Sequence, residues 1–257
     1  MRNAIVINVC EVHKMNEVIK QEGVEDLAEC FATSRRPDRG TRVVVLVGDS
    51  NLDFQRAVLD DLEPTARQIL DAAGLRPVEG YLLFAFDKGG VLAEIGLDET
   101  VELWDRRIHR FLAFESERSF RFMLDGRRFE WGQETITGRV LKILADVKPK
   151  THGVWLERRD EPDLLIADDD TVNLAGRKLE RFRTGKLFFL CIEGTLHPWP
   201  QKTITMEQIA ELGGWDPSDG VIEVDADQNE RQLSPGEVVT LKPGMAYGKR
   251  IKWKRGK

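Results

Sequence analysis

The sequence predicts an α+β fold made of three tandem small domains, each a mixed sheet packed on one helix, and three observations predict it. A short helical pattern occurs three times along the 257 residues. Each copy follows a hairpin pattern and precedes a strand pattern. The order strand, strand, helix, strand, short segment, strand takes about 70 residues each time, which is a small layered unit that can bury a core.

The helices carry the clearest repeat. The second copy reads T-I-T-G-R-V-L-K-I-L, the third reads T-I-T-M-E-Q-I-A-E-L, and P-T-A-R-Q-I-L is a looser first copy. A threonine hydroxyl at each start can cap free backbone N–H groups, and a proline beyond each end stops the helix. The capping residues are Thr65, Thr137 and Thr205, and the stops are Pro77, Pro149 and Pro217.

Strand patterns surround each helix. Asp125-Gly126 and Glu193-Gly194 join alternating runs as hairpin turns, and in the first copy the return strand is expected over residues 52–58. A strand opening on glycine follows each helix, at residues 80–86, 153–158 and 220–226. A repeated short segment comes next, at residues 98–103, 169–174 and 236–241. The final strands are expected at residues 109–114, 180–184 and 249–254.

The repeat also gives the domain boundaries. They are expected near Arg42, Ser119 and Lys186, with almost no linker between domains. The predicted domains are residues 42–118, 119–185 and 186–257. Residues 1–41 form an extension outside the repeat, in which we expect a strand over residues 4–9, an amphipathic helix over residues 12–31 and a loop over residues 33–41.

Composition narrows the possible functions. Hydrophobic residues make up 41% and charged residues 32%, as in packed globular domains. The net charge of -6 argues against a general nucleic-acid binder, and no apolar run is long enough for a membrane span. Three cysteines without paired spacing fit the reducing cytoplasm, where we expect the protein. No cofactor is expected.

Several tempting features have ordinary explanations. The four histidines and three cysteines show no metal-ligand spacing and no nucleophile motif, so we expect neither a catalytic site nor a metal site, and no enzyme. The acidic residues 168–170 are expected to form a solvated turn. Glycine pairs at 89–90 and 213–214 suit turns and helix ends. Alternation places one face of a strand opposite another, with Ile222, Val224 and Ala226 on the first and Val221, Glu223 and Asp225 on the second. One strand does not settle which face is exposed, and core packing is the favoured use of the apolar set.

The chain resembles the bacterial multiubiquitin proteins, which carry several ubiquitin-like β-grasp domains in tandem. The resemblance rests on the T-I-T-G-R-V-L-K-I-L helix, the segment D-D-T-V-N-L and the ending E-R-F-R-T, and it covers residues 42–257. It implies a protein modifier that works with activating-enzyme-like, conjugating-enzyme-like and metalloprotease deconjugase-like proteins, in systems of antiviral defence, and that is attached to target proteins.

The same resemblance directs attention to residues 249–257. A ubiquitin-like modifier needs a slender tail that ends in glycine, and removal of Lys257 would expose Gly256 for conjugation. The basic side chains of Lys252, Lys254 and Arg255 would dock on an acidic surface of an activating enzyme. The departures from ubiquitin are a single glycine in place of two and the need for trimming. The alternative for these residues is an ordinary basic tail.

Two functions remain open at this point. In the first, the chain is a conjugated modifier whose three domains travel together, because neither internal domain ends in a pair of glycines. In the second, it is a scaffold or adaptor that is never conjugated and that gathers partners, or assembles with itself, through multivalent contacts. The two differ in whether the last four residues are needed.

Overall fold

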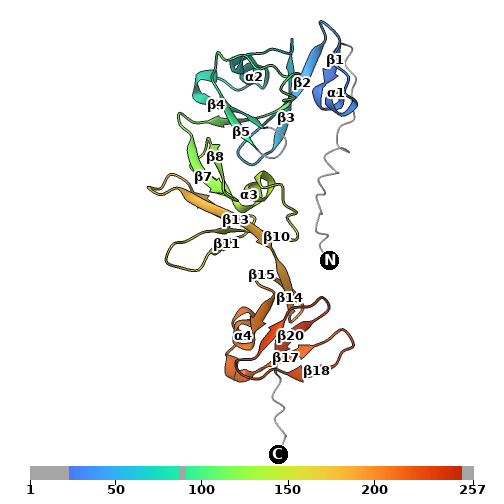
Figure 1. The fold of residues 1–257 in the computed structure, drawn as a ribbon, viewed down its shortest axis with the longest axis vertical. Coiled ribbons are helices and arrows are strands. Elements are labelled where there is room, and N and C mark those ends of the chain that lie inside the picture. The colour runs from blue at the N-terminus through green and yellow to red at the C-terminus, as the bar shows by residue number, and fades with distance from the viewer. Residues whose placement is uncertain (1–22, 87–90, 251–257) are drawn as a thin grey trace, which may run out of the picture. The chain divides into compact units, whose positions relative to one another are not determined.

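Three tandem domains are present in the computed structural model, which describes residues 23–86 and 91–250 (Figure 1). Each domain packs a mixed sheet on one helix of the repeat, so the predicted fold class is confirmed. The chain divides into two compact units, of which one holds the first domain and the other holds the second and third. Within the described residues no helix combines the length and apolarity that crossing a membrane requires.

The first domain has a six-stranded sheet in the order β1-β2-β6-β4-β5, with β3 paired to the other edge of β2. The central helix α2 begins after Thr65, whose hydroxyl accepts a hydrogen bond from the N–H of Gln68, as predicted for a cap. The elements are β1 Val24–Asp26, α1 Leu27–Thr33, β2 Arg42–Gly48, β3 Phe54–Leu59, α2 Ala66–Ala72, η1 Val78–Gly80, β4 Tyr81–Phe86, β5 Leu92–Ile95 and β6 Arg110–Glu115.

Part of the N-terminal extension belongs to the first domain. Strand β1 pairs in parallel with the start of β2, whereas β6 pairs in parallel with its end. Because β3 occupies the opposite edge of β2, β1 fills the half-edge that β6 leaves free. Helix α1 then buries Leu27 and Phe31 in the core of the domain.

The helix expected over residues 12–31 is therefore wrong at residues 24–26 and confirmed at residues 27–31, whereas residues 12–22 lie outside the described part of the chain. Residues 24–26 form a strand because their backbone groups pair with β2, and the helix starts only at Leu27, capped by the Asp26 carboxylate, and ends at Thr33. A loop follows, as expected. The strand expected over residues 4–9 lies outside the described residues.

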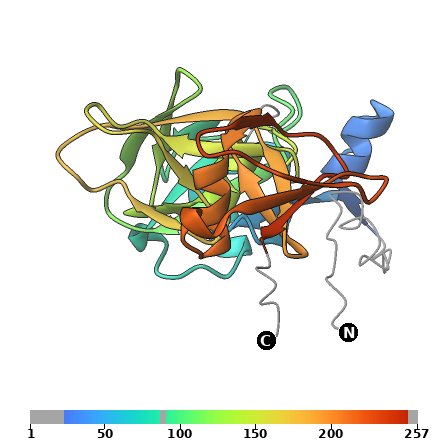
Figure 2. The ribbon, with the colours of Figure 1, turned by 90° about the horizontal axis from the view of Figure 1, so that it is seen from below.

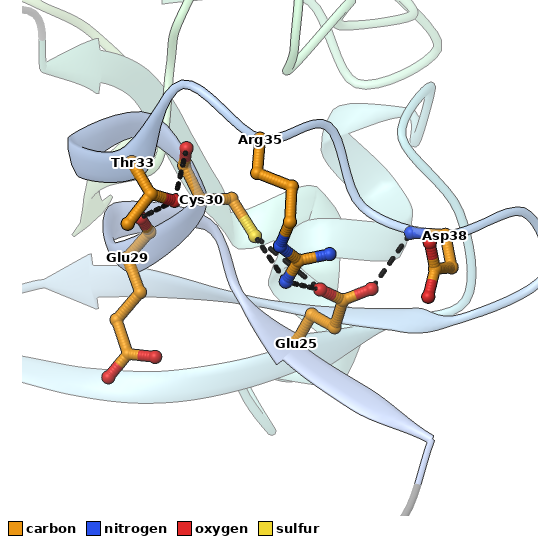
Figure 3. Close-up of polar contacts among 6 residues, drawn as sticks. All are labelled: Glu25, Glu29, Cys30, Thr33, Arg35 and Asp38. Carbon is orange, nitrogen blue, oxygen red and sulfur yellow. Dashed lines mark hydrogen bonds and ion pairs between the residues drawn. The ribbon is translucent and has the colours of Figure 1, made fainter.

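A polar cluster fastens that loop to β1 (Figure 3). The guanidinium of Arg35 donates to the carboxylate of Glu25, and the Asp38 N–H donates to it at 2.8 Å. The hydrogen bond from Arg35 is the main cause that holds the pKa of Glu25 below its ordinary value of 4.5. The Cys30 thiol lies 3.7 Å from the same carboxylate, and burial raises its pKa. The thiol is thus a protonated structural group.

The second domain has a five-stranded sheet in the order β11-β10-β13-β7-β8 and a small two-stranded sheet of β9 and β12. Its core contains Phe122, which is stacked on Phe129 and edge-on to Phe182, and it also contains the fully buried Trp131. The elements are β7 Phe120–Leu124, β8 Arg127–Trp131, β9 Thr135–Thr137, α3 Gly138–Leu144, β10 His152–Leu156, β11 Leu164–Ile166, β12 Thr171–Asn173 and β13 Glu180–Lys186.

The first residues of helix α3 hold the acidic turn at residues 168–170 by hydrogen bonds. The N–H groups of Gly138 and Arg139 donate to carbonyls of the turn, so the turn approaches closely, and a Cβ on Gly138 would lie 2.1 Å from the carbonyl oxygen of Ala167. The Asp168 carboxylate lies 2.6 Å from the Nζ of Lys142, a lysine whose side chain is 7% exposed. The turn therefore does more than face solvent, because it neutralises a buried cation.

The third domain repeats this arrangement with the order β15-β14-β20-β17-β18 and the pair β16 and β19. Helix α4 lies against the sheet of this domain (Figure 2) and begins at the predicted cap Thr205. It ends at Gly213, where Gly214 adopts the left-handed conformation that suits glycine, as expected. The elements are β14 Phe188–Ile192, β15 Thr195–Trp199, β16 Thr203–Thr205, α4 Met206–Gly213, η2 Pro217–Asp219, β17 Val221–Val224, β18 Glu230–Gln232, β19 Val238–Thr240 and β20 Ala246–Lys249.

Two expectations about the third domain need correction. The final strand begins at Ala246, three residues before the predicted start, because its pairing with β17 runs from Val224–Ala246 to Val221–Lys249. Core packing was also the favoured use of Ile222, yet Val221 is the buried residue and Ile222 is partly exposed. Alternation defines two faces but does not say which of them meets the helix.

Candidate functional site

The predicted conjugation residue Gly256 and the processing residue Lys257 lie outside the described residues. The same holds for the predicted docking residues Lys252, Lys254 and Arg255. The structure describes the segment that leads to them, strand β20 and Arg250. The candidate site is therefore the place where the chain leaves the third domain, which we call the third exit and define by Lys249 and Arg250.

All three domains release the chain in the same way. The first N–H beyond the final strand donates to the carbonyl just before the strand that follows the helix. These hydrogen bonds run from Ser116 to Gly80 at 3.1 Å, from Leu187 to Thr151 at 2.9 Å and from Arg250 to Gly220 at 3.2 Å. The third exit is thus the structural equivalent of the two points at which the chain passes into the next domain.

The second exit is the point where the chain leaves the second domain, between Lys186 and Leu187. It lies further along strands β10 and β13 than the other two exits lie along theirs. The ladder between β10 and β13 continues to the pair His152–Lys186, past Gly153 and Gly185. Gly153 aligns in sequence with Gly80 and Gly220 but lies inside this ladder. Glycine is needed there because a Cβ would lie 2.8 Å from the indole of the buried Trp155.

Acidic groups from two segments hold the third exit. The Nζ of Lys249 lies 2.8 Å from the Asp219 carboxylate, at the end of η2. On the other side the N–H of Lys249 donates to the carboxylate of Glu193 at 3.3 Å, and the Glu193 N–H donates to the carbonyl of Tyr247 at 2.9 Å. The end of β20 is therefore fixed before the chain continues to residue 251.

The second domain uses the same hairpin contact. Asp125, at the turn between β7 and β8, has a left-handed φ of 50°, and its N–H donates to the Phe182 carbonyl. Its carboxylate accepts from the N–H and the hydroxyl of Thr184, at 2.6 and 2.8 Å. The turn signature predicts the two hairpins, but the role of their acidic side chains in fastening the last strand is visible only in the structure.

Strand β20 also carries a buried tyrosine next to an ion pair. Glu223 on the neighbouring strand β17 is 8% exposed, and Arg231 of β18 pairs with it at 2.9 Å. Burial, with the nearby Glu223 carboxylate as a smaller cause, raises the pKa of Tyr247 to about 12. The phenol therefore stays neutral at physiological pH and serves the packing of β20.

The chemistry available at the third exit is that of presentation. Its side chains are two cations, of which Lys249 is paired with Asp219, and no described residue there forms a pair of nucleophile and base. Across residues 23–86 and 91–250, no group of three histidine, cysteine, aspartate or glutamate side chains is placed to hold a metal ion. What the exit does is hold the end of β20 at a defined place on the domain.

Comparison with known proteins agrees with the repeat. The multiubiquitin family model matches three tandem regions, residues 51–116, 120–186 and 188–247. No curated protein matches the chain. Each matched region contains the helix of one domain and most of its strands, with β1 and β2 of the first domain lying before the first match, and together the regions span most of the sequence. The chain belongs to the multiubiquitin family.

Proposed function

We propose that this chain is a protein modifier of a bacterial ubiquitination-like system that serves antiviral defence. It is attached to target proteins through Gly256 after Lys257 is removed. The Gly256 carboxylate is first adenylated by ATP, with release of pyrophosphate. It then passes to a thiol as a thioester, with release of AMP, and finally to an amine or hydroxyl of the target as an amide or ester, which frees the thiol. The protein itself catalyses none of these steps and acts in the cytoplasm.

The equivalence of the three exits is the observation that supports this proposal. The first two exits lead into another domain, whereas the third leads into residues 251–257 with their single glycine. Because one residue spans at most about 3.5 Å, Gly256 can reach about 20 Å from Arg250, enough to enter the cleft of a modifying enzyme. The contacts of Lys249 with Asp219 and Glu193 fix the point on the folded domain from which this reach is measured.

The partners follow from the same chemistry. An activating-enzyme-like protein would supply the adenylation, a conjugating-enzyme-like protein the thiol, and a metalloprotease deconjugase-like protein the trimming and removal. Lys252, Lys254 and Arg255 place three positive charges just before Gly256. Charges of this kind raise the rate of encounter with an acidic surface, and the effect falls with salt. Charge reversal at these positions should slow adenylation most at low ionic strength.

The test is the intact mass of the protein recovered from its native host, with its covalent adducts. We expect loss of Lys257 and a set of heavier adducts that disappear in Gly256→Ala. A chain that lacks Lys257 from the start is the matched control, since it needs no trimming and should form the same adducts. Recovery of the full-length mass alone, with all partners present, would refute the modifier proposal.

The alternative is a scaffold or adaptor that gathers partners or copies of itself. One observation favours it: β13 continues almost directly into β14, and the second and third domains lie in one compact unit, which could present several binding surfaces together. A scaffold should keep its function when residues 254–257 are deleted, whereas a modifier should lose it. The same deletion strain therefore separates the two proposals.

A further inference from the structure

The joint between the second and third domains is a single buried residue. Leu187 stands between the end of β13 and the start of β14, is 8% exposed, and its N–H donates to the Thr151 carbonyl at 2.9 Å. Figure 1 shows the two strands running on from one domain into the next. The joint is therefore short, buried and hydrogen-bonded to the second domain.

An apolar groove lies at this joint. It encloses about 530 Å³, which is within the range of ligand-binding clefts. We call it the junction groove; its apolar lining is Leu165, Ile166, Leu187, Phe189, Leu196 and Pro198, and Pro149 and Lys150 stand among its remaining residues. Leu196 and Phe189 are 64% and 37% exposed, so apolar surface is open to solvent here.

The charges of the groove do not cancel. Lys142 and Asp168 lie in its wall and form an ion pair with each other at 2.6 Å, so together they add no net charge. Lys150 is exposed, and no carboxylate pairs with it in the part of the chain that the structure describes. The junction groove, with Lys150 unpaired among the described residues, therefore suits a ligand that has an apolar side chain with a carboxylate near it.

We infer that the junction groove binds a short segment of a partner protein that inserts a large apolar side chain between Phe189 and Leu196 and places an acidic side chain against Lys150. The edge strand β15 supports a side-chain mode of binding, because Pro198 removes one of the N–H groups that an added strand would need. Neither domain alone provides the groove, so only the tandem arrangement creates it. The inference does not depend on Gly256 and holds for a modifier or a scaffold.

The test uses the full-length chain and three sets of fluorescent twelve-residue peptides. All sets share a central leucine and phenylalanine, flanked by glutamate, by glutamine or by lysine. We expect the glutamate set to bind with Kd of about 10–100 µM, as is usual for a single apolar anchor. The lysine set should bind at least about tenfold more weakly, because it meets Lys150 with like charge.

Variants decide whether the groove is responsible. Leu196→Asp should weaken the binding of the glutamate peptides at least about tenfold, since the substitution places a charge where the apolar side chain of the peptide binds. Val238→Asp is the matched control, because Val238 is 60% exposed on the same domain and does not line the groove. Lys150→Glu should reverse the preference, so that the lysine peptides bind more tightly than the glutamate peptides.

Three results would overturn the inference. The first is that no peptide set binds the wild-type chain. The second is binding that Leu196→Asp and Val238→Asp change equally, or a preference that Lys150→Glu does not reverse. The third is a wild-type dimer in light scattering that Leu196→Asp disrupts, which would assign the groove to a second copy of this chain. Formation of Gly256 adducts is measured separately, so failure here leaves the modifier proposal untouched.

Discussion

Replacing Leu27 with alanine tests whether residues 23–41 are part of the first domain. Leu27 is fully buried, with 0% of its surface exposed, in a core shared with helix α2 and the sheet. Removing a fully buried leucine side chain costs the transfer free energy of the lost atoms plus the cost of the cavity, about 3 to 5 kcal/mol. We therefore expect the free energy of unfolding of the first domain to fall by about 3 kcal/mol.

The assay follows each domain by its own tryptophans. Trp104 is the only tryptophan within residues 42–118, and its ring lies 5.2 Å from that of Phe31 on α1. In ¹⁹F NMR of the chain labelled with 5-fluorotryptophan, the Trp104 signal, assigned with Trp104→Phe, reports α1 and the first domain during a urea titration. With an m-value of about 1.5 kcal/mol/M, the loss lowers its midpoint by about 2 M.

A control variant and the other domains make this prediction refutable. Val58 lies in the same domain and is 38% exposed, so Val58→Ala should change stability by less than about 1 kcal/mol. The tryptophans of the second and third domains should keep their midpoints in both variants. If Leu27→Ala left the Trp104 midpoint within 0.3 M of wild type, the inclusion of α1 in the core would be wrong.

Three further predictions concern single contacts. Gly138→Ala should destabilise the second domain by about 2 kcal/mol or more in urea, because the new Cβ meets the carbonyl oxygen of Ala167 at 2.1 Å. The pKa of Glu25 is lowered in the folded chain, so the pairing of Glu25 with Arg35 stabilises the first domain at pH values above the ordinary carboxyl pKa of 4.5. This stabilisation is lost as the pH falls through and below that value. Glu25→Gln should remove this part of the pH dependence of the urea midpoint. Iodoacetamide at pH 8 should label Cys30 slowly, because the thiol is buried and its pKa is raised.

Each of these has a matched comparison in the same chain. For Gly138 the comparison is Gly176→Ala, where the nearest atom to a new Cβ is 3.8 Å away, and equal losses from both would contradict the close approach. For Cys30 it is Cys191, which is partly exposed and should be labelled before Cys30 in peptide mass spectra. For Glu25, an acid-induced loss of first-domain stability that is the same in wild type and Glu25→Gln would show that the cluster with Arg35 contributes nothing to it.

Much of the fold follows from local chemistry. Threonine caps such as Thr137 and Thr205 mark helix starts because the hydroxyl satisfies N–H groups within the same turn. The hairpins at Asp125-Gly126 and Glu193-Gly194 are equally local, since both turn residues need positive φ. Repetition of these signals at near-constant spacing then indicates three copies of one unit. The candidate tail at residues 251–257 is likewise a feature of the sequence.

Other properties depend on which distant segments meet. Residues 24–26 have no strong strand pattern of their own, and they become β1 because a free half-edge of β2 lies beside them. The carboxylate of Glu193 fastens Lys249, 56 residues away, a contact that no local pattern contains. Leu187 and Leu196 join Leu165 in one groove only after two domains have folded and docked.

The sequence by itself thus determined the repeated unit, the helix caps, the turns and the family, because each is encoded within a few neighbouring residues or in their repetition. Tertiary structure alone decided which face of β17 is buried, how the third exit is anchored, and where apolar surface stays open at the joint. Those properties are set by contacts between segments far apart in the chain, whose partners a one-dimensional pattern does not specify.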